Sequence, residues 1–221
     1  MVKNFSEEVT VMPPRYFYDT VINEVVNGKL KVDTIWHQAE NIKLTNQLNE
    51  EVSLYDIEGK IIVANFFFTR CPSICPRLTN NMKLLQNSMK QRDRRKLVDT
   101  SFVHFVSFSV DPERDSVPVL KSYADRYGVN SDAWWLLTGD KKEIYDFALN
   151  ELKLATVDGE GVDEHFIHSE RFVLLDKNKV VRGFYNGLDS TSVQKLAEDI
   201  IYLKLEKDPN VKRDIFKPKP F

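Results

Sequence analysis

The feature that most constrains this chain is a nearly continuous apolar run, residues 61–68, that leads directly into its two cysteines, Cys71 and Cys75. Such a run is typical of a central strand that is covered on both faces. Apolar residues then recur at helical spacing, so we expect the strand to turn into a helix. A cysteine at this junction meets the unpaired N–H groups and the positive dipole of the helix, which stabilise a thiolate. If the helical turn begins at Pro72, both sulfurs face the same way.

Strand and helix patterns alternate three times from this run onward, and the chain then ends in a hairpin and a helix. The expected strands are 42–45, 61–68, 102–110, 134–138, 171–175 and 180–185, and the expected helices are 78–89, 115–127, 139–148 and 190–203. Parallel strands need crossover helices, and right-handed crossovers place these helices on both faces of a sheet. With the cysteines at the end of the first core strand, the pattern predicts an α/β, thioredoxin-like three-layer sandwich around a mixed sheet.

We expect one domain with an extension at each end. Its 42% hydrophobic and 29% charged residues, in a chain of 221, are sufficient for one well-buried core. Residues 1–40 are interpreted as an N-terminal extension packed on the domain, with a hairpin turn at Asn27-Gly28. Residues 41–207 are the predicted thioredoxin-like domain, and residues 208–221 are a C-terminal tail.

Charge and hydropathy exclude some functions. The net charge of −2 comes from 31 basic and 33 acidic residues mixed along the chain, so no broad positive field exists for nucleic acid. No apolar run approaches the ~18 residues that a membrane-spanning helix needs, and the polar start lacks the form of a secretion signal. We therefore expect either a soluble protein or one whose targeting segment is not part of this sequence.

Four segments together resemble, in order and spacing, the Sco/SenC family of copper proteins. They are 66–76 with a CPxxCP motif, 109–115 with an SxDPERD motif, Leu137-Thr138-Gly139, and His168-Ser169 leading into 172–176. The similarity spans roughly residues 41 to 206. Each motif alone is weak evidence, whereas the combination is specific.

The resemblance implies a copper-binding protein, for Cu(I) or Cu(II), that helps to assemble the binuclear copper centre of cytochrome c oxidase. It implies a periplasmic or otherwise extracytoplasmic location and a membrane tether. Its partners would be the copper-bearing oxidase subunit and possible further copper chaperones or thiol reductants. The family's metal ligands carry over to Cys71, Cys75 and His168. The aspartate near the site carries over to Asp111, where an orienting role competes with simple capping of the turn at Pro112.

The chemistry of these residue types points the same way. Soft thiolates select Cu(I), and an added imidazole gives a three-coordinate site that tolerates Cu(II), whereas zinc would require a fourth ligand. His165 competes with His168, but residues three apart on an extended segment point to opposite faces, so we expect only one to reach the sulfurs. We expect His104 to be a packed or edge histidine within a strand, and His37 has no assigned role.

Three other readings of the cysteines remain open. In a thiol-disulfide oxidoreductase, Cys71 would attack and Cys75 would resolve the mixed disulfide. The three-residue spacing between the cysteines, and Ile167-His168 where such enzymes place a cis-proline, favour copper. Thr69 near Cys71 is compatible with a peroxidase, but the proline that such enzymes carry ahead of that threonine is missing. A purely structural disulfide would close too short a loop to stabilise the fold much.

Overall fold

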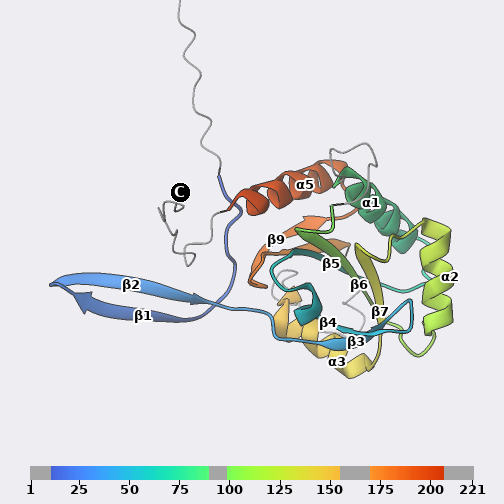
Figure 1. Cartoon of the computed structure of the whole chain (residues 1–221), viewed down its shortest axis with the longest axis horizontal. Helices are drawn as coiled ribbons and strands as arrows, with labels where there is room; N and C mark the ends of the chain where they lie inside the picture. Colours follow the sequence, from blue (N-terminus) through green and yellow to red (C-terminus); the bar gives the residue numbers. More distant parts are fainter. Residues whose placement is uncertain (1–10, 90–98, 155–169, 207–221) are drawn as a thin grey trace, which may run out of the picture.

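The computed structural model describes residues 11–89, 99–154 and 170–206. They form a seven-stranded mixed sheet in the order β4-β3-β7-β6-β5-β8-β9 and a separate two-stranded sheet of β1 and β2 (Figure 1). The strands of the large sheet are β3 (Lys43–Asn46), β4 (Glu51–Ser53), β5 (Ile61–Phe67), β6 (Val103–Ser109), β7 (Trp134–Thr138), β8 (Arg171–Leu175) and β9 (Val181–Asn186). The helices are α1 (Ile74–Ser88), α2 (Val117–Tyr127), α3 (Lys141–Asp146) and α5 (Ser190–Leu205), with the 3₁₀ helix η1 (Leu54–Ile57) and the π-helix η2 (Phe147–Glu151).

The parallel strands β5 and β6 form the centre of the large sheet. Their register runs from Ile61 opposite Val103 to Phe67 opposite Ser109, and every residue of both strands is buried. One core cluster packs α1, α2 and α5 against the sheet, and a second cluster packs η1 and α3 on the other face. The predicted thioredoxin-like, three-layer α/β sandwich is therefore confirmed.

Most predicted elements are present, with ends shifted by a few residues. Gly128 follows α2 in the left-handed conformation, with a φ of 62°, and ends that helix as expected. Two differences stand out. The unassigned segment 51–57 forms β4 and η1, and the helix expected over 139–148 begins as α3 and continues as η2 to Glu151.

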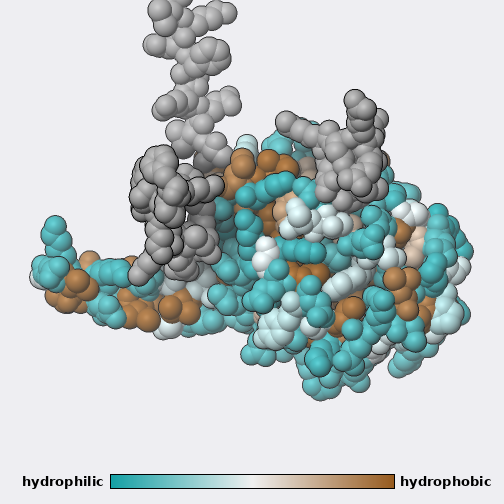
Figure 2. Space-filling model, viewed as in Figure 1, coloured by the Kyte–Doolittle hydropathy of each residue, from teal (hydrophilic) through white to brown (hydrophobic). Residues whose placement is uncertain are grey.

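The predicted hairpin turn at Asn27-Gly28 is also confirmed. β1 (Tyr18–Val26) pairs antiparallel with β2 (Lys29–Trp36), and both turn residues have positive φ, 53° for Asn27 and 73° for Gly28. Positive φ at both positions is the geometry that favours Asn-Gly in two-residue hairpins. Every residue of β1 is exposed, and the hairpin extends away from the domain (Figure 1) with apolar side chains on its surface (Figure 2).

The segment that precedes the hairpin contacts the domain. The Tyr16 N–H donates to the Val181 carbonyl at 3.1 Å, and the buried Arg182 guanidinium donates to the carbonyls of Pro13 and Pro14. The extension is thus held at its base by β9, while the domain boundaries at residues 40 and 207 stay predictions. No helix in the described ranges is long and apolar enough to span a bilayer.

Candidate metal centre

The two cysteines lie where β5 leads into α1. After β5 the chain makes a turn in which the Cys71 N–H donates to the Phe68 carbonyl at 3.3 Å. The helix begins at Ile74 rather than at Pro72, with Ser73 as its N-cap. Its first turn nevertheless brings the pair together, because the Cys75 N–H donates to Cys71 Sγ at 3.4 Å. Both thiols are free, and only 8% of Cys71 and 3% of Cys75 is exposed.

The two thiols differ in acidity. Burial alone would raise the pKa of Cys71, but N–H groups of the first helical turn, chiefly that of Cys75, bond to its sulfur and lower the pKa below the ordinary value. Burial raises the pKa of Cys75 to about 12, and the nearby Cys71 and Asp115 add to the rise. Cys71 is therefore the more acidic thiol of the pair, and Cys75 must lose its proton before it can bind a metal or form a disulfide.

A buried polar network supports the turn that carries Cys71. Asp115 is fully buried, and its carboxylate accepts hydrogen bonds from the Thr69 N–H at 3.1 Å and the Thr69 hydroxyl at 2.5 Å. The Ser109 hydroxyl donates to the same carboxylate at 2.6 Å. Sequence reasoning treated Asp115 only as the start of a helix. The signal that could have found it is its place as the last residue of the SxDPERD motif, whose first residue is Ser109.

Asp111 lies in the turn between those two motif residues. Its carboxylate accepts a hydrogen bond from the exposed Arg114 side chain at 3.2 Å. Its carbonyl accepts from the N–H groups of Arg114 and Asp115, and its own N–H donates to Ser109 Oγ. No contact within the described residues joins Asp111 to either cysteine. The turn is thus closed by main-chain hydrogen bonds, and both roles considered for the Asp111 side chain, capping of the turn and orientation of the site, stay predictions.

The histidines fall into two groups. His168, the predicted third ligand, and its competitor His165 lie outside the described residues. His104 is packed, as expected, in β6, with its ring 4.3 Å from that of Trp135. His37 lies at the base of the hairpin, 2.8 Å from the Asp19 carboxylate. Within the ranges that the structure describes, no group of three His, Cys, Asp or Glu side chains could hold a metal.

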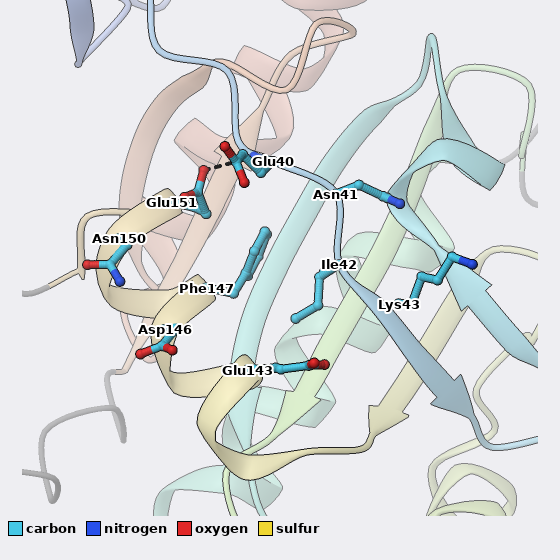
Figure 3. A pocket seen from close by; sticks show the side chains of 9 residues that line it. All are labelled: Glu40, Asn41, Ile42, Lys43, Glu143, Asp146, Phe147, Asn150 and Glu151. Atoms are coloured by element: carbon cyan, nitrogen blue, oxygen red, sulfur yellow. Dashed lines mark hydrogen bonds between the residues drawn. The ribbon is translucent and has the colours of Figure 1, made fainter.

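A separate pocket lies on the other side of the sheet. It is formed by the segment leading into β3 and by α3 with η2, and Figure 3 shows Ile42 and Phe147 among its lining residues. The Glu40 N–H donates to Glu151 Oε2 across one end at 2.9 Å. Ile42 and Phe147 belong to the core cluster opposite the one that contains the cysteines. The pocket therefore has no part in the cysteine site.

Comparison with known sequences gives a consistent result. A protein-family model described as SCO1/SenC matches residues 37–203. The SCO1 protein homolog of Bacillus subtilis strain 168 is 35% identical over 174 residues, which cover 78% of this chain and 86% of that protein.

Comparison with solved structures agrees. A SCO1/SenC family lipoprotein from Bacillus anthracis str. Ames is 31% identical with a TM-score of 0.62, over 76% of this chain and 95% of that one. BsSco, a Sco-family cytochrome c oxidase assembly protein with a disulfide switch, is 31% identical with a TM-score of 0.62, over 79% of this chain and 98% of that one. Yeast Sco1 with copper bound shares the fold at 20% identity and a TM-score of 0.59, over 80% of this chain and 98% of that one.

Proposed function

The chain belongs to the SCO1/SenC family, and on this basis we propose that it is a copper-binding metallochaperone. It delivers copper to the binuclear copper site of cytochrome c oxidase, or prepares the cysteines of that site. Cys71, Cys75 and His168 bind the metal. The observation that carries the proposal is the pair of free thiols at the junction of β5 and α1, where the Cys75 nitrogen lies 3.4 Å from Cys71 Sγ. Yeast Sco1, a more distant member of the same fold, has been solved with copper bound.

The donor set of the cysteine pair suits copper. Two thiolates held close together at the start of a helix are soft ligands, and soft ligands favour Cu(I). Cys71 is already disposed to ionise, whereas Cys75 must lose a proton when the metal binds. Binding of Cu(I) therefore releases protons and becomes tighter as pH rises. An imidazole from His168 would complete a three-coordinate site that also accepts Cu(II).

Transfer of copper proceeds by exchange of ligands. Cys71 retains a small exposed area, and the neighbouring Pro72 and Ser73 are exposed, so a thiolate of a partner can approach the metal from this side. The partners are the copper-bearing subunit of cytochrome c oxidase and, upstream, other copper chaperones or thiol reductants. The protein acts outside the cytoplasm at a membrane surface, in line with the description of the Bacillus anthracis relative as a lipoprotein.

A second function, thiol-disulfide exchange, is favoured by the unequal acidity of the two thiols. The Cys71 thiolate attacks one sulfur of a partner disulfide, and the released partner thiolate takes up a proton. Cys75 then loses its proton and attacks Cys71 Sγ, which frees the second partner sulfur as a thiolate that is protonated in turn. The pair gives two electrons to the partner, one of the two protons taken up comes from Cys75 and the other from solvent, and a Cys71–Cys75 disulfide forms. BsSco, at 31% identity, has a disulfide switch.

An anaerobic copper titration against a competing chelator tests the proposed function. We expect the reduced parent to bind one Cu(I), and Cys71→Ala and Cys75→Ala to abolish tight binding because each removes a soft ligand. His168→Ala should weaken binding, chiefly of Cu(II), and leave the fold intact. His165→Ala is the matched control and should bind as the parent does. The ligand assignment is wrong if His168→Ala equals the parent in both oxidation states.

A further inference from the structure

The side chain of Asp115 is fully buried, with an exposed fraction of 0%. Within residues 11–89, 99–154 and 170–206, its carboxylate is hydrogen-bonded by Thr69 and Ser109 and forms no ion pair with a Lys, Arg or His side chain. Taking a carboxylate out of water is costly unless hydrogen bonds satisfy its oxygens. Here two hydroxyl groups and one backbone N–H supply these bonds, from Thr69 and Ser109. The fold thus keeps a buried carboxylate whose hydrogen bonds come from two separate segments, the turn after β5 and the end of β6.

Those hydrogen bonds connect the ends of the two central strands. Thr69 follows β5 by two residues, and Ser109 is the last residue of β6. The strands are already paired at this point, because Phe67 lies opposite Ser109 and the Val110 N–H donates to the Phe67 carbonyl at 2.9 Å. Beyond the last paired residues, the Asp115 carboxylate connects the end of β6 to the turn that follows β5, because it accepts hydrogen bonds from both Ser109 and Thr69.

That turn determines where the Cys71 sulfur lies. It runs from Phe68 to Cys71 and is closed by the hydrogen bond between the Cys71 N–H and the Phe68 carbonyl, at 3.3 Å. Thr69 is inside the turn, and both its backbone and its side chain bond to Asp115. Any shift of Thr69 is therefore passed to Cys71, and from Cys71 to its 3.4 Å contact with the Cys75 N–H.

We propose that Asp115 is a positioning residue for the cysteine pair, which acts through Thr69 and Ser109 to hold the two sulfurs in the arrangement that one copper ion or one disulfide requires. The inference rests on the proposed function of Cys71 and Cys75. Asp115 makes no hydrogen bond to either sulfur, so its positioning effect acts through Thr69 and Ser109. Burial raises the pKa of Cys75, and the negative charge of Asp115 separately adds to that rise. Residues that orient metal ligands in this way are typically needed for tight binding.

Four variants test the proposal. Asp115→Asn keeps the size of the side chain but replaces one acceptor oxygen with a donor. Thr69→Val keeps the shape and loses the hydroxyl, whereas Thr69→Ser keeps the hydroxyl. Asp199→Asn is the control for loss of a buried carboxylate elsewhere in the core. Asp199 accepts hydrogen bonds from the Tyr185 hydroxyl at 2.7 Å and from the Lys195 ammonium at 2.6 Å, and forms no hydrogen bond to the cysteine turn.

Two readouts are measured beside thermal unfolding: copper binding, with the Cu(II)–thiolate absorption bands, and the exchange equilibrium of the metal-free cysteine pair with dithiothreitol. We expect Asp115→Asn and Thr69→Val to weaken Cu(I) binding by about tenfold or more and to shift the absorption bands. Both should move the exchange equilibrium about tenfold toward the dithiol, or about 30 mV, because less well positioned sulfurs form a disulfide less readily. Thr69→Ser should restore the parent values, and Asp199→Asn should alter only the unfolding temperature.

The proposal is overturned if Asp115→Asn matches the parent in both readouts, or if Asp199→Asn changes them equally. If Asp115→Asn does not fold, the comparison of Thr69→Val with Thr69→Ser decides in the same way. If the parent itself binds no copper, the proposed function fails, yet the metal-free exchange equilibrium still tests Asp115. A shift there supports the positioning role, and no shift contradicts it.

Discussion

Cys71 lies in the turn before α1 and Cys75 in the first turn of that helix, and the two thiols differ in acidity because the groups around them differ. The Cys71 sulfur accepts N–H groups from the start of α1, which favour its charged form. The Cys75 sulfur is more deeply buried, and negative groups lie close to it. We therefore expect Cys71 to act as the nucleophile or first ligand, and Cys75 to react after it.

Alkylation as a function of pH tests this difference. We expect iodoacetamide to modify Cys71 with a midpoint below its ordinary pKa of 9.0, and Cys75 to react slowly at all pH values well below about 12. Single variants Cys75→Ser and Cys71→Ser isolate each thiol, and peptide mapping by mass spectrometry locates the label. Faster modification of Cys75 than of Cys71 at neutral pH would contradict the assignment.

His104 is another group whose charge is set by the fold. Only 1% of the residue is exposed, and neither ring nitrogen has a hydrogen-bond partner among the described residues. Burial lowers the pKa of His104 to about 3, and the charge of Lys60 contributes. The folded state thus holds this ring neutral, whereas the unfolded chain protonates it at its ordinary pKa of 6.5.

The stability of the protein should therefore fall in acid. Between pH 6.5 and about 3 the unfolded state binds one more proton at His104 than the folded state does. The free energy of unfolding then decreases as pH falls, by at most about 1.4 kcal/mol per pH unit from this group. Urea denaturation of the parent and of His104→Leu at pH 7, 6, 5 and 4 isolates the effect. Parallel pH profiles for the two proteins would show that His104 is not responsible.

At the scale of elements, Arg182 of β9 joins several segments. It is 2% exposed, and its guanidinium donates to Asp176 at 2.9 Å and to Glu206, just after α5, at 2.6 Å. It also donates to the carbonyls of Pro13 and Pro14 in the N-terminal extension. One buried cation thus links the hairpin of β8 and β9, the last helix and the extension.

Removal of this cation should be costly. Arg182→Ala leaves the buried Asp176 carboxylate without its partner, and such a loss typically destabilises a protein by about 3–5 kcal/mol. Lys121→Ala, which breaks the exposed pair with Asp125, is the matched control and should cost about 0.5 kcal/mol or less. Urea unfolding measures both values, and a cost below about 1 kcal/mol for Arg182→Ala would refute the linking role.

The elements that the sequence predicts well are those with long buried patterns. β5 and β6 are continuous apolar runs, and the face of α1 repeats Leu78, Met82 and Leu85, so their positions follow from periodicity alone. The segment 51–57 was missed because its buried residues, Val52, Leu54 and Ile57, are spaced by two and then by three. That spacing fits neither a strand nor a helix.

The site was predictable in part for a related reason. The two cysteines are only four positions apart, and the junction of β5 and α1 brings them together without any contact to a distant part of the sequence. Asp115 and Thr69 are 46 residues apart in the sequence, and a local sequence pattern cannot predict a hydrogen bond between such distant residues. Aspartate before a helix is common as a cap, which is how the sequence was interpreted, although the N-cap of α2 is Ser116. His168 lies outside the described residues and stays a prediction.

At the scale of the whole molecule, the fold separates the site from the exposed apolar surface. The cysteines, Thr69, Ser109 and Asp115 gather where the parallel strands β5 and β6 end, the edge of an α/β sheet where ligands commonly bind. The β1–β2 hairpin extends from another part of the domain (Figure 1), and its exposed side chains include Val25 and Leu30. The hydrogen bonds described around the cysteines therefore come from residues of the sandwich.

The central claim is that one copper ion is held by both sulfurs and one imidazole. X-ray absorption of the Cu(I)-loaded protein counts these ligand atoms directly, with His168→Ala as the comparison. We predict two sulfur donors and one nitrogen donor in the parent, and loss of the nitrogen alone in the variant. A spectrum of the parent with fewer than two sulfur donors would contradict the account.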